Sequence, residues 1–150
     1  MTPAFHILLV EDSPTDVMII ERALREGQID HRLTVIRDGR QALDHLRKIG
    51  TPGTPDDEEP DLILLDLNLP GLDGSQVLAQ IKADPDLRAI PVIVLTTSRR
   101  DEDILQAYQA GANSFIQKPS EYPRYRELVA TLYSYWHDTA LRAPRRRPRR

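Results

Sequence analysis

Several residues with chemically useful side chains follow directly on short apolar runs of the sequence. They are Glu11, Asp12, Asp66, Thr96, Thr97 and Lys118. Three carboxylates held together without a cation repel one another and raise each other's pKa. Mg²⁺ removes that conflict, because it prefers a few carboxylates together with water and phosphate oxygens. A lysine beside such a cation offers a positive charge to a phosphoryl oxygen, and an aspartate there can accept a phosphoryl group as an acyl phosphate.

The apolar runs themselves predict the buried strands of a parallel sheet. They cover residues 5–10, 33–36, 61–66, 91–96 and 114–117, and segments with helical periodicity lie between them. The helices are expected to begin near Ser13, Asp38, Asp73, Ser98 and Glu121, and the last is expected to end at His137. Five strands that alternate with five helices indicate a doubly wound α/β fold.

The position of the polar residues along this pattern favours a functional site. In an open α/β sheet the carboxyl ends of the strands meet at one edge, and ligands bind there. Each residue alone is weak evidence, because an acid after a strand is more often a helix cap and a Lys-Pro pair is more often a turn. Phe115, in the last strand, is core packing by default, and a switching role for it depends on Thr96 and Lys118.

Taken together, these motifs resemble the receiver domains of two-component response regulators. The resemblance rests on the acid pair Glu11-Asp12, the segment DLNLPGLDG from Asp66, Thr96, and the segment AGANSFIQKP, which contains Phe115 and ends in Lys118-Pro119. It covers residues 5–137. It implies a flavodoxin-like sheet with strand order 2-1-3-4-5, and a receiver (response regulatory) domain over residues 1–140.

The resemblance also implies roles for the acidic residues. Asp66 would accept a phosphoryl group from a histidine kinase, and Asp12 and Asp66 would bind Mg²⁺ directly. Glu11 would act largely through a bound water, and Asn68 would lend its backbone carbonyl to the metal. The chain would be a phosphoryl acceptor with self-catalysed phosphorylation and dephosphorylation rather than an enzyme.

A second group of residues would respond to the phosphoryl group. Lys118 would bind one of its oxygens, the hydroxyl of Thr96 would turn toward it, and Phe115 would then rotate inward. The Lys118-Pro119 peptide bond is expected to be cis. Thr97 stands where the family usually has a smaller residue, which would slow access to the phosphoryl group.

Three segments resemble those of a subfamily, the stand-alone regulators paired with bacterial phytochromes. They are the long acidic loop over residues 51–60, the segment IPVIVLTTSRRDEDI over residues 90–104, and the aromatic end of the last helix, with Tyr133, Tyr135 and Trp136. These rings follow one another too closely to share one helical face, so some of them should be exposed. An exposed aromatic patch indicates an interface, and a homodimer is its simplest form. The alternative is a helix end that folds over the core.

Composition and charge limit the remaining possibilities. The chain has no cysteine, no apolar run of the roughly 20 residues that span a bilayer and no signal peptide, so it is interpreted as cytoplasmic. Its formal net charge is −3, yet six of the last nine residues are arginine. Residues 141–150 are therefore expected to be a disordered basic tail. Such a tail favours an alternative function, a nucleic-acid-associated regulator, although no folded recognition element accompanies it.

Three other function classes fit the sequence poorly. A nucleotide-binding enzyme of this fold needs a glycine-rich turn after the first strand, where the chain has EDSPTD. A phosphatase with an aspartyl nucleophile would have a second acid at position 68, which is Asn68. A transcription factor needs a further domain, and the residues after His137 are too few for one. The expected output is therefore contact with other proteins.

Overall fold

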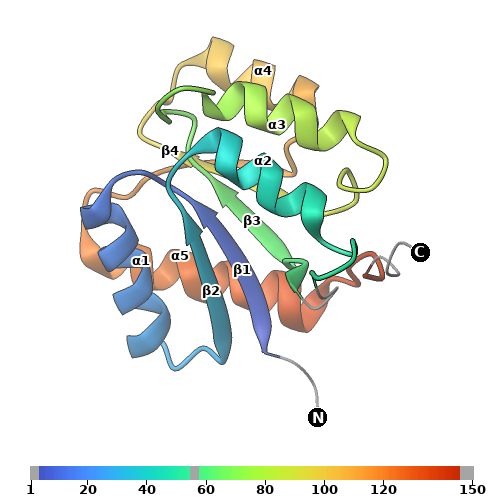
Figure 1. The fold of residues 1–150 in the computed structure, drawn as a ribbon. Coiled ribbons are helices and arrows are strands. Elements are labelled where there is room, and N and C mark those ends of the chain that lie inside the picture. Colours follow the sequence, from blue (N-terminus) through green and yellow to red (C-terminus); the bar gives the residue numbers. More distant parts are fainter. Residues whose placement is uncertain (1–3, 55–57, 146–150) are drawn as a thin grey trace.

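Strands and helices alternate along the protein in the computed structural model, which describes residues 4–54 and 58–145 (Figure 1). The strands are β1 (Phe5–Val10), β2 (His31–Ile36), β3 (Leu62–Leu65), β4 (Val92–Thr96) and β5 (Ser114–Gln117). The α-helices are α1 (Pro14–Glu26), α2 (Gly39–Lys48), α3 (Gly74–Ala83), α4 (Asp101–Ala110) and α5 (Tyr122–Tyr133). A π-helical segment, η2 (Ser134–Thr139), continues α5.

The strands form one parallel sheet in the order β2-β1-β3-β4-β5. This confirms the flavodoxin-like, doubly wound fold predicted from the sequence. Strand β1 lies between β2 and β3, so the chain winds outward from it in both directions. The carboxyl ends of β1 and β3 are therefore neighbours at the point where the winding reverses, which is where open α/β sheets bind ligands.

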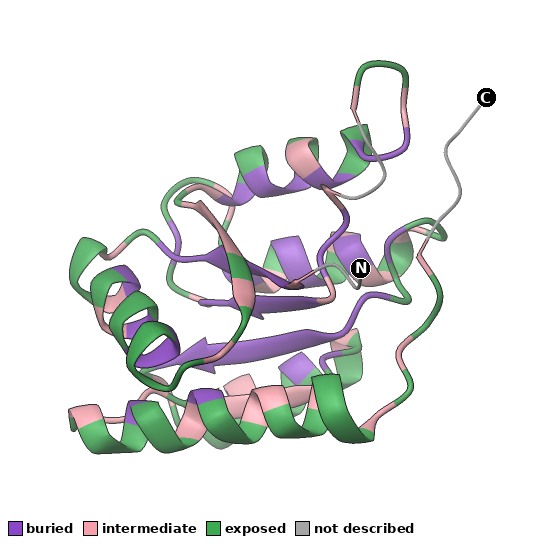
Figure 2. Cartoon of the chain, turned by 90° about the horizontal axis from the view of Figure 1, so that it is seen from below, coloured by how far each residue is buried: buried purple, intermediate pink, exposed green. Residues whose placement is uncertain are grey.

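Two apolar layers cover the two faces of the sheet, because successive side chains of a strand point to opposite faces. Helices α2, α3 and α4 cover one face, and α1 and α5 cover the other (Figures 1 and 2). In β1, Leu8 and Val10 belong to the first layer, and Ile7 and Leu9 belong to the second. The central strands are buried on both faces, which explains their almost uninterrupted apolar sequences.

The predicted helix starts agree closely with the structure. The side chains of Ser13, Asp38 and Asp73 each accept a hydrogen bond from a backbone amide in the first turn of α1, α2 and α3. Helix α4 begins at Asp101 without a side-chain cap, and its C-cap is Gly111, whose φ of 108° suits glycine. Among the described residues, no helix is long and apolar enough to cross a bilayer.

The C-terminal part of the chain differs from the expectation in two ways. The last helix widens into a π-helix, in which the amide of Ala140 donates to the carbonyl of Tyr135, five residues back. Residues 141–145 were expected to belong to a disordered tail, yet Arg142 and Arg145 contact Asp61, just before β3. A carboxylate on the body holds these arginines, which composition alone cannot indicate. Residues 146–150, and residues 55–57 of the acidic loop, lie outside the described residues.

Candidate functional site

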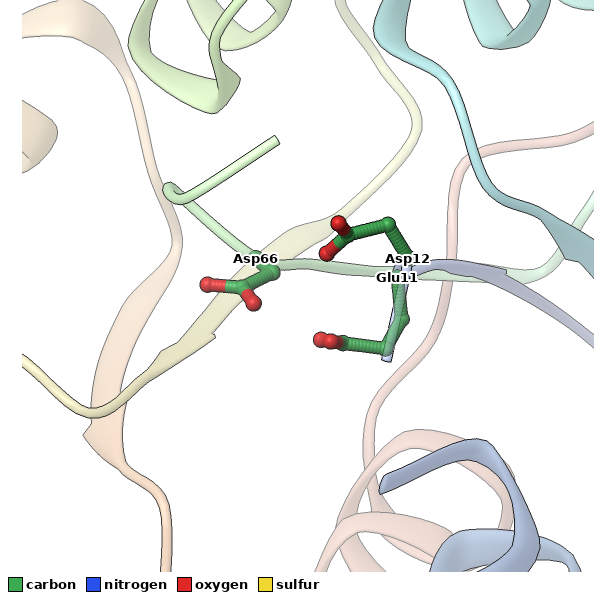
Figure 3. Close-up of side chains that lie close together, drawn as sticks. All are labelled: Glu11, Asp12 and Asp66. Carbon is green, nitrogen blue, oxygen red and sulfur yellow. The ribbon is translucent and has the colours of Figure 1, made fainter. Parts of the chain in front are cut away.

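Three carboxylates gather where β1 and β3 end. Val10 is paired with Leu65, so Glu11 and Asp66 leave the sheet side by side, and the amide of Asp66 donates to the carbonyl of Val10 at 3.0 Å. Glu11, Asp12 and Asp66 each place one oxygen within 4.8 Å of the others (Figure 3). Glu11 and Asp66 are buried, whereas Asp12 is exposed.

Lys118 reaches this cluster from the turn after β5. Its amide donates to the carbonyl of Thr96 at 2.7 Å, which fixes the turn against β4. Its Nζ lies 3.0 Å from Glu11 Oε2, 3.0 Å from Asp66 Oδ2 and 2.7 Å from Asp16 Oδ2. Burial alone would lower the pKa of Lys118, but its hydrogen bonds to the three carboxylates outweigh burial and raise it. The ammonium group is therefore charged throughout the physiological range.

Asp16 is a member of the site that sequence reasoning missed. It stands in the first turn of α1, where an acid is expected merely because it complements the helix dipole. Only the fold shows that this turn lies beside Lys118, 102 residues further along the chain. The one signal in the sequence was a second acid one helical turn after Asp12.

The charge of Glu11 depends on its neighbours. Its side chain is 2% exposed, and it accepts a hydrogen bond from the amide of Ser13 at 3.1 Å. Burial and, after it, the nearby Asp66 raise the pKa of Glu11 to about 7, although Lys118 opposes the change. The metal-free site therefore takes up a proton on Glu11 more readily than an ordinary glutamate would, and an added cation would compete with that proton.

The loop between β3 and α3 holds Asp66 in place. The amide of Asn68 donates to Asp66 Oδ1 at 3.1 Å, and the amide of Gly74 donates to the carbonyl of Leu67 at 3.0 Å. A side chain at Gly74 would collide with the carbonyl oxygen of Asp66, so glycine is required for this close approach. Asn68 as a metal ligand through its backbone carbonyl stays a prediction.

The donor set fits a hard divalent cation. Glu11, Asp12 and Asp66 offer carboxylate oxygens only, which is the ligand type that Mg²⁺ and Mn²⁺ prefer. With Asp16 there are four carboxylates around the single ammonium of Lys118. Such an excess of negative charge in a partly buried place is unfavourable unless a cation binds.

The residues expected to respond to a phosphoryl group lie along β4 and β5. Thr96 is fully buried, and its hydroxyl lies 3.5 Å from the side-chain nitrogen of Asn68. Thr97 is exposed. Phe115 is half-buried against the layer of α2, α3 and α4, and its amide donates to the hydroxyl of Tyr108 at 3.1 Å.

The prediction of a cis bond between Lys118 and Pro119 is wrong, because the bond is trans. The trans isomer is the lower in energy even before proline. With this trans bond, Lys118 reaches the carboxylates of Glu11, Asp16 and Asp66.

The aromatic end of the last helix is divided between core and surface. Tyr133 stacks on His137 with ring centres 4.4 Å apart, and Tyr133 and Trp136 pack against the layer of α1 and α5. Tyr135 is 53% exposed, and its ring meets that of Trp136 edge to face at 5.1 Å. Folding over the core thus accounts for two of the three rings.

Known proteins resemble this chain in sequence and structure. The family model for the response regulator receiver domain matches residues 7–130. Response regulator Rcp1 of Synechocystis sp. is 41% identical over 137 residues, which are 91% of this chain and 92% of Rcp1. The structure of the phosphorylated cyanobacterial phytochrome response regulator RcpA has a TM-score of 0.85 at 38% identity, over 95% of this chain and 100% of RcpA. The Mn²⁺-bound form of Rcp1 has a TM-score of 0.80 at 39% identity, with the same coverage.

Proposed function

The chain belongs to the response regulator receiver domain family, and on that premise we propose that it accepts a phosphoryl group from a histidine kinase on Asp66. The observation that carries this proposal is the geometry around Asp66. Its Oδ2 lies 3.0 Å from Lys118 Nζ, and its carboxylate is within 4.8 Å of Glu11 and Asp12. Receiver domains are signalling proteins, so this phosphorylation would change contacts with other proteins.

The transfer needs little covalent chemistry from the protein. A carboxylate oxygen of Asp66 forms a bond to phosphorus while the bond from phosphorus to the kinase histidine nitrogen breaks, and the histidine ring keeps the electron pair. Lys118 faces the oxygens of the transferring group, and the hydroxyl of Thr96 donates to one of them. Residues Asn68, Ser98 and Arg100 border a polar depression beside this loop, through which a donor would approach.

We propose Mg²⁺ as the cation of the site. Asp12 and Asp66 would bind it directly, Glu11 through a water, and Asn68 through its backbone carbonyl. When bound, Mg²⁺ neutralises charge on the transferring phosphoryl oxygens. The Mn²⁺-bound form of Rcp1 supports a divalent cation for a related chain, and the all-oxygen donor set supports one here.

The kinase partner proposed here is a phytochrome-type sensor kinase. The support is the similarity to RcpA, a phytochrome response regulator, over 95% of this chain. The alternative of a nucleic-acid-associated regulator gains nothing from the described part of the tail, where Arg142 and Arg145 are paired with Asp61. We assign the protein to the cytoplasm, where histidine kinases present their phosphorylated domains.

The central experiment is phosphorylation by acetyl phosphate with Mg²⁺, followed by intact-protein mass spectrometry. Wild-type protein should gain one phosphoryl group, and Asp66→Asn should gain none. Asp61→Asn is the matched control, because it removes a carboxylate from the other end of β3. Labelling of Asp66→Asn at the wild-type rate would show that another residue is the acceptor.

We also propose that the protein forms a homodimer through the face that contains α5 and η2. Tyr135 is exposed there, and Trp136 lies beside it, so a two-fold pairing would cover both rings. Light scattering at several protein concentrations should show a dimer that Tyr135→Glu dissociates. Met18→Glu on α1, at a side chain that is 67% exposed, should not. A wild-type protein that stays monomeric at high concentration, with and without acetyl phosphate, would exclude this pairing.

A further inference from the structure

We infer that Asp16 is a positioning residue for Lys118, which it keeps beside Asp66 when the metal and the phosphoryl group occupy the other carboxylates. The inference rests on the proposed function, because it concerns phosphorylation of Asp66. The contact between Asp16 Oδ2 and Lys118 Nζ is 2.7 Å, shorter than the 3.0 Å contacts from Lys118 to Glu11 and to Asp66. Asp16 thus provides the shortest of the three ion pairs that Lys118 makes.

The hydrogen-bonding capacity of Lys118 explains why one anchor matters. An ammonium group has three donors and no acceptor. In the structure these donors have three carboxylate partners, Glu11, Asp16 and Asp66. The side chain of Lys118 is 6% exposed, so a lost partner is not simply replaced by bulk water. A lysine with no remaining carboxylate would be free to leave this position.

Phosphorylation and metal binding remove two of these partners and leave the third. Formation of the acyl phosphate removes the charge of the Asp66 carboxylate, and Glu11 faces the metal. Asp16 is outside the group of carboxylates that lie within 4.8 Å of one another. Its carboxylate therefore stays available for the ion pair with Lys118. One donor of Lys118 then stays on Asp16, and the other two are available to phosphoryl oxygens.

Helix α1 fixes the position of Asp16. The amide of Asp16 donates to Ser13 Oγ at 3.3 Å, and Pro14 begins the helix. Tyr125 of α5 is a buried phenol beside this turn. Burial, and after it the charge of Asp16, raises the pKa of Tyr125. The side chain of Asp16 is 24% exposed. The anchor is therefore built on a rigid helix rather than on a mobile loop, which suits a group that positions another.

The opposite role, in which Asp16 withholds Lys118 from the phosphoryl group, gives a different result in the same experiment. If Asp16 competes with the phosphoryl oxygens, Asp16→Asn speeds phosphorylation by acetyl phosphate. If Asp16 is an anchor, the same substitution slows phosphorylation and shortens the lifetime of the phosphorylated protein. The sign of the change in rate therefore decides between them.

The test compares wild type with Asp16→Asn and with Glu21→Gln, a control that removes one negative charge from an exposed position of the same helix. Phosphorylation by acetyl phosphate with Mg²⁺ should be slower in Asp16→Asn by on the order of tenfold. Mg²⁺ affinity, measured by calorimetry, should stay within about threefold of wild type, because the lost charge is not a metal ligand. Glu21→Gln should match wild type in both measurements.

A further readout reports on Lys118 itself. In protein labelled with ¹⁵N-lysine and loaded with Mg²⁺ and beryllofluoride, a phosphoryl mimic, the Lys118 ammonium signal should be protected from hydrogen exchange. Asp16→Asn should lose this protection, and Asp16→Glu should restore part of it. A role limited to fold stability would change the unfolding temperature and leave this signal as in wild type, which would overturn the inference.

Three further outcomes would contradict the inference. An Asp16→Asn protein that is phosphorylated as fast as wild type, or faster, overturns it and leaves the proposed function intact. A loss of Mg²⁺ affinity as large as that of Asp12→Ala would make Asp16 a metal ligand instead. A wild-type protein that accepts no phosphoryl group overturns the proposed function, and this inference with it.

Discussion

The two ends of strand β3 carry the same residue type with opposite charge balance. Asp61 precedes the strand and Asp66 follows it. At Asp61 one carboxylate has two guanidinium partners, with Arg145 Nη2 at 3.2 Å from both of its oxygens and Arg142 Nε at 3.6 Å. The amide of His6 also donates to it, at 2.8 Å.

At Asp66 the ratio is reversed. One ammonium ion, that of Lys118, serves three carboxylates, and Asp12 adds a fourth nearby. The carboxyl end of β3 therefore has too little positive charge to balance its carboxylates. The amino end has enough positive charge to balance the carboxylate of Asp61. A binding site can therefore be told from a structural ion pair by its charge, because the site carries an excess charge that its ligand will neutralise.

Removing one carboxylate from each end should have opposite effects on stability. Asp61→Asn keeps the acceptor for the His6 amide but leaves Arg142 and Arg145 without their anion. We expect it to lower the free energy of unfolding by about 1.5 to 3 kcal/mol, the range for hydrogen bonds to charged groups. Asp66→Asn keeps the acceptor for the Asn68 amide and relieves repulsion, so stability should be unchanged or higher. Urea unfolding at pH 7.5 with a chelator measures both.

Two controls support this comparison. Asp44→Asn, at an exposed position of α2, should leave the free energy of unfolding as it is. Deletion of residues 141–150 should lower stability as Asp61→Asn does, and the two changes should not add, because they remove the same ion pairs. Equal losses in Asp61→Asn and Asp66→Asn would show that both ends of β3 are structural clusters.

The sequence alone was sufficient to predict the sheet and the grouping of Glu11, Asp12, Asp66 and Lys118 at its carboxyl edge. The segment DLILLD has an aspartate at each end, and the rule that ligands bind beyond the carboxyl ends of parallel strands selects Asp66 over Asp61. Strand positions and helix starts also followed from local signals, since each central strand is an apolar run and α1, α2 and α3 begin with a capping side chain. The strand order followed from the resemblance to receiver domains.

Partners distant in sequence could not be predicted in this way. Asp16 and Asp61 both looked like ordinary acids, at a helix start and at a strand start. Their roles depend on Lys118, Arg142 and Arg145, which are 102, 81 and 84 residues away. Only the packing of α1 beside α5, and of the C-terminal segment beside β3, brings these cations near. Amino-acid composition alone predicted that the arginines of residues 141–150 would be solvated charges of a disordered tail.

The pH dependence of stability should also differ between the two ends. Burial, followed by the effect of Asp66, raises the pKa of Glu11 to about 7 from an ordinary value of 4.5. The folded state then holds this proton more tightly than the unfolded state. The stability from Glu11 is therefore full below about pH 4.5 and is lost as the pH rises to about 7.

Glu11→Gln tests this directly. In metal-free buffer, wild type should lose about 1 to 3 kcal/mol relative to Glu11→Gln between pH 5 and pH 8. Saturating Mg²⁺ should remove the loss in wild type, because the cation binds the deprotonated carboxylates and stabilises the folded state by mass action. A difference between the two proteins that stays constant with pH would place the pKa of Glu11 near its ordinary value and weaken the argument that the site lacks positive charge.

The smallest expected effect has the opposite sign and belongs to the other end of the sheet. His6 is 1% exposed, its Nε2 lies 2.8 Å from the hydroxyl of Thr34, and its Nδ1 lies 3.4 Å from the carbonyl of Glu59. Burial, and after it the charge of Arg32, lowers the pKa of His6. The folded state therefore resists protonation, so stability from this group is present above about pH 6.5 and is lost as the pH falls below it.

His6→Gln should remove this loss of stability at acidic pH. It should leave unchanged the pH dependence of stability that Glu11 causes at the Asp66 end. Unfolding midpoints of wild type and His6→Gln, measured between pH 7.5 and pH 5, should converge as the pH falls, because only wild type buries a group that resists protonation. His31→Gln, a half-exposed histidine on β2, serves as the control and should keep the wild-type dependence. Glu11 changes stability in the same pH interval, in the opposite direction. Comparing Glu11→Gln with the double variant Glu11→Gln and His6→Gln therefore isolates the contribution of His6. If His6→Gln and His31→Gln respond to pH alike, His6 titrates as an ordinary histidine, and the charge-balanced end of the sheet is open to water.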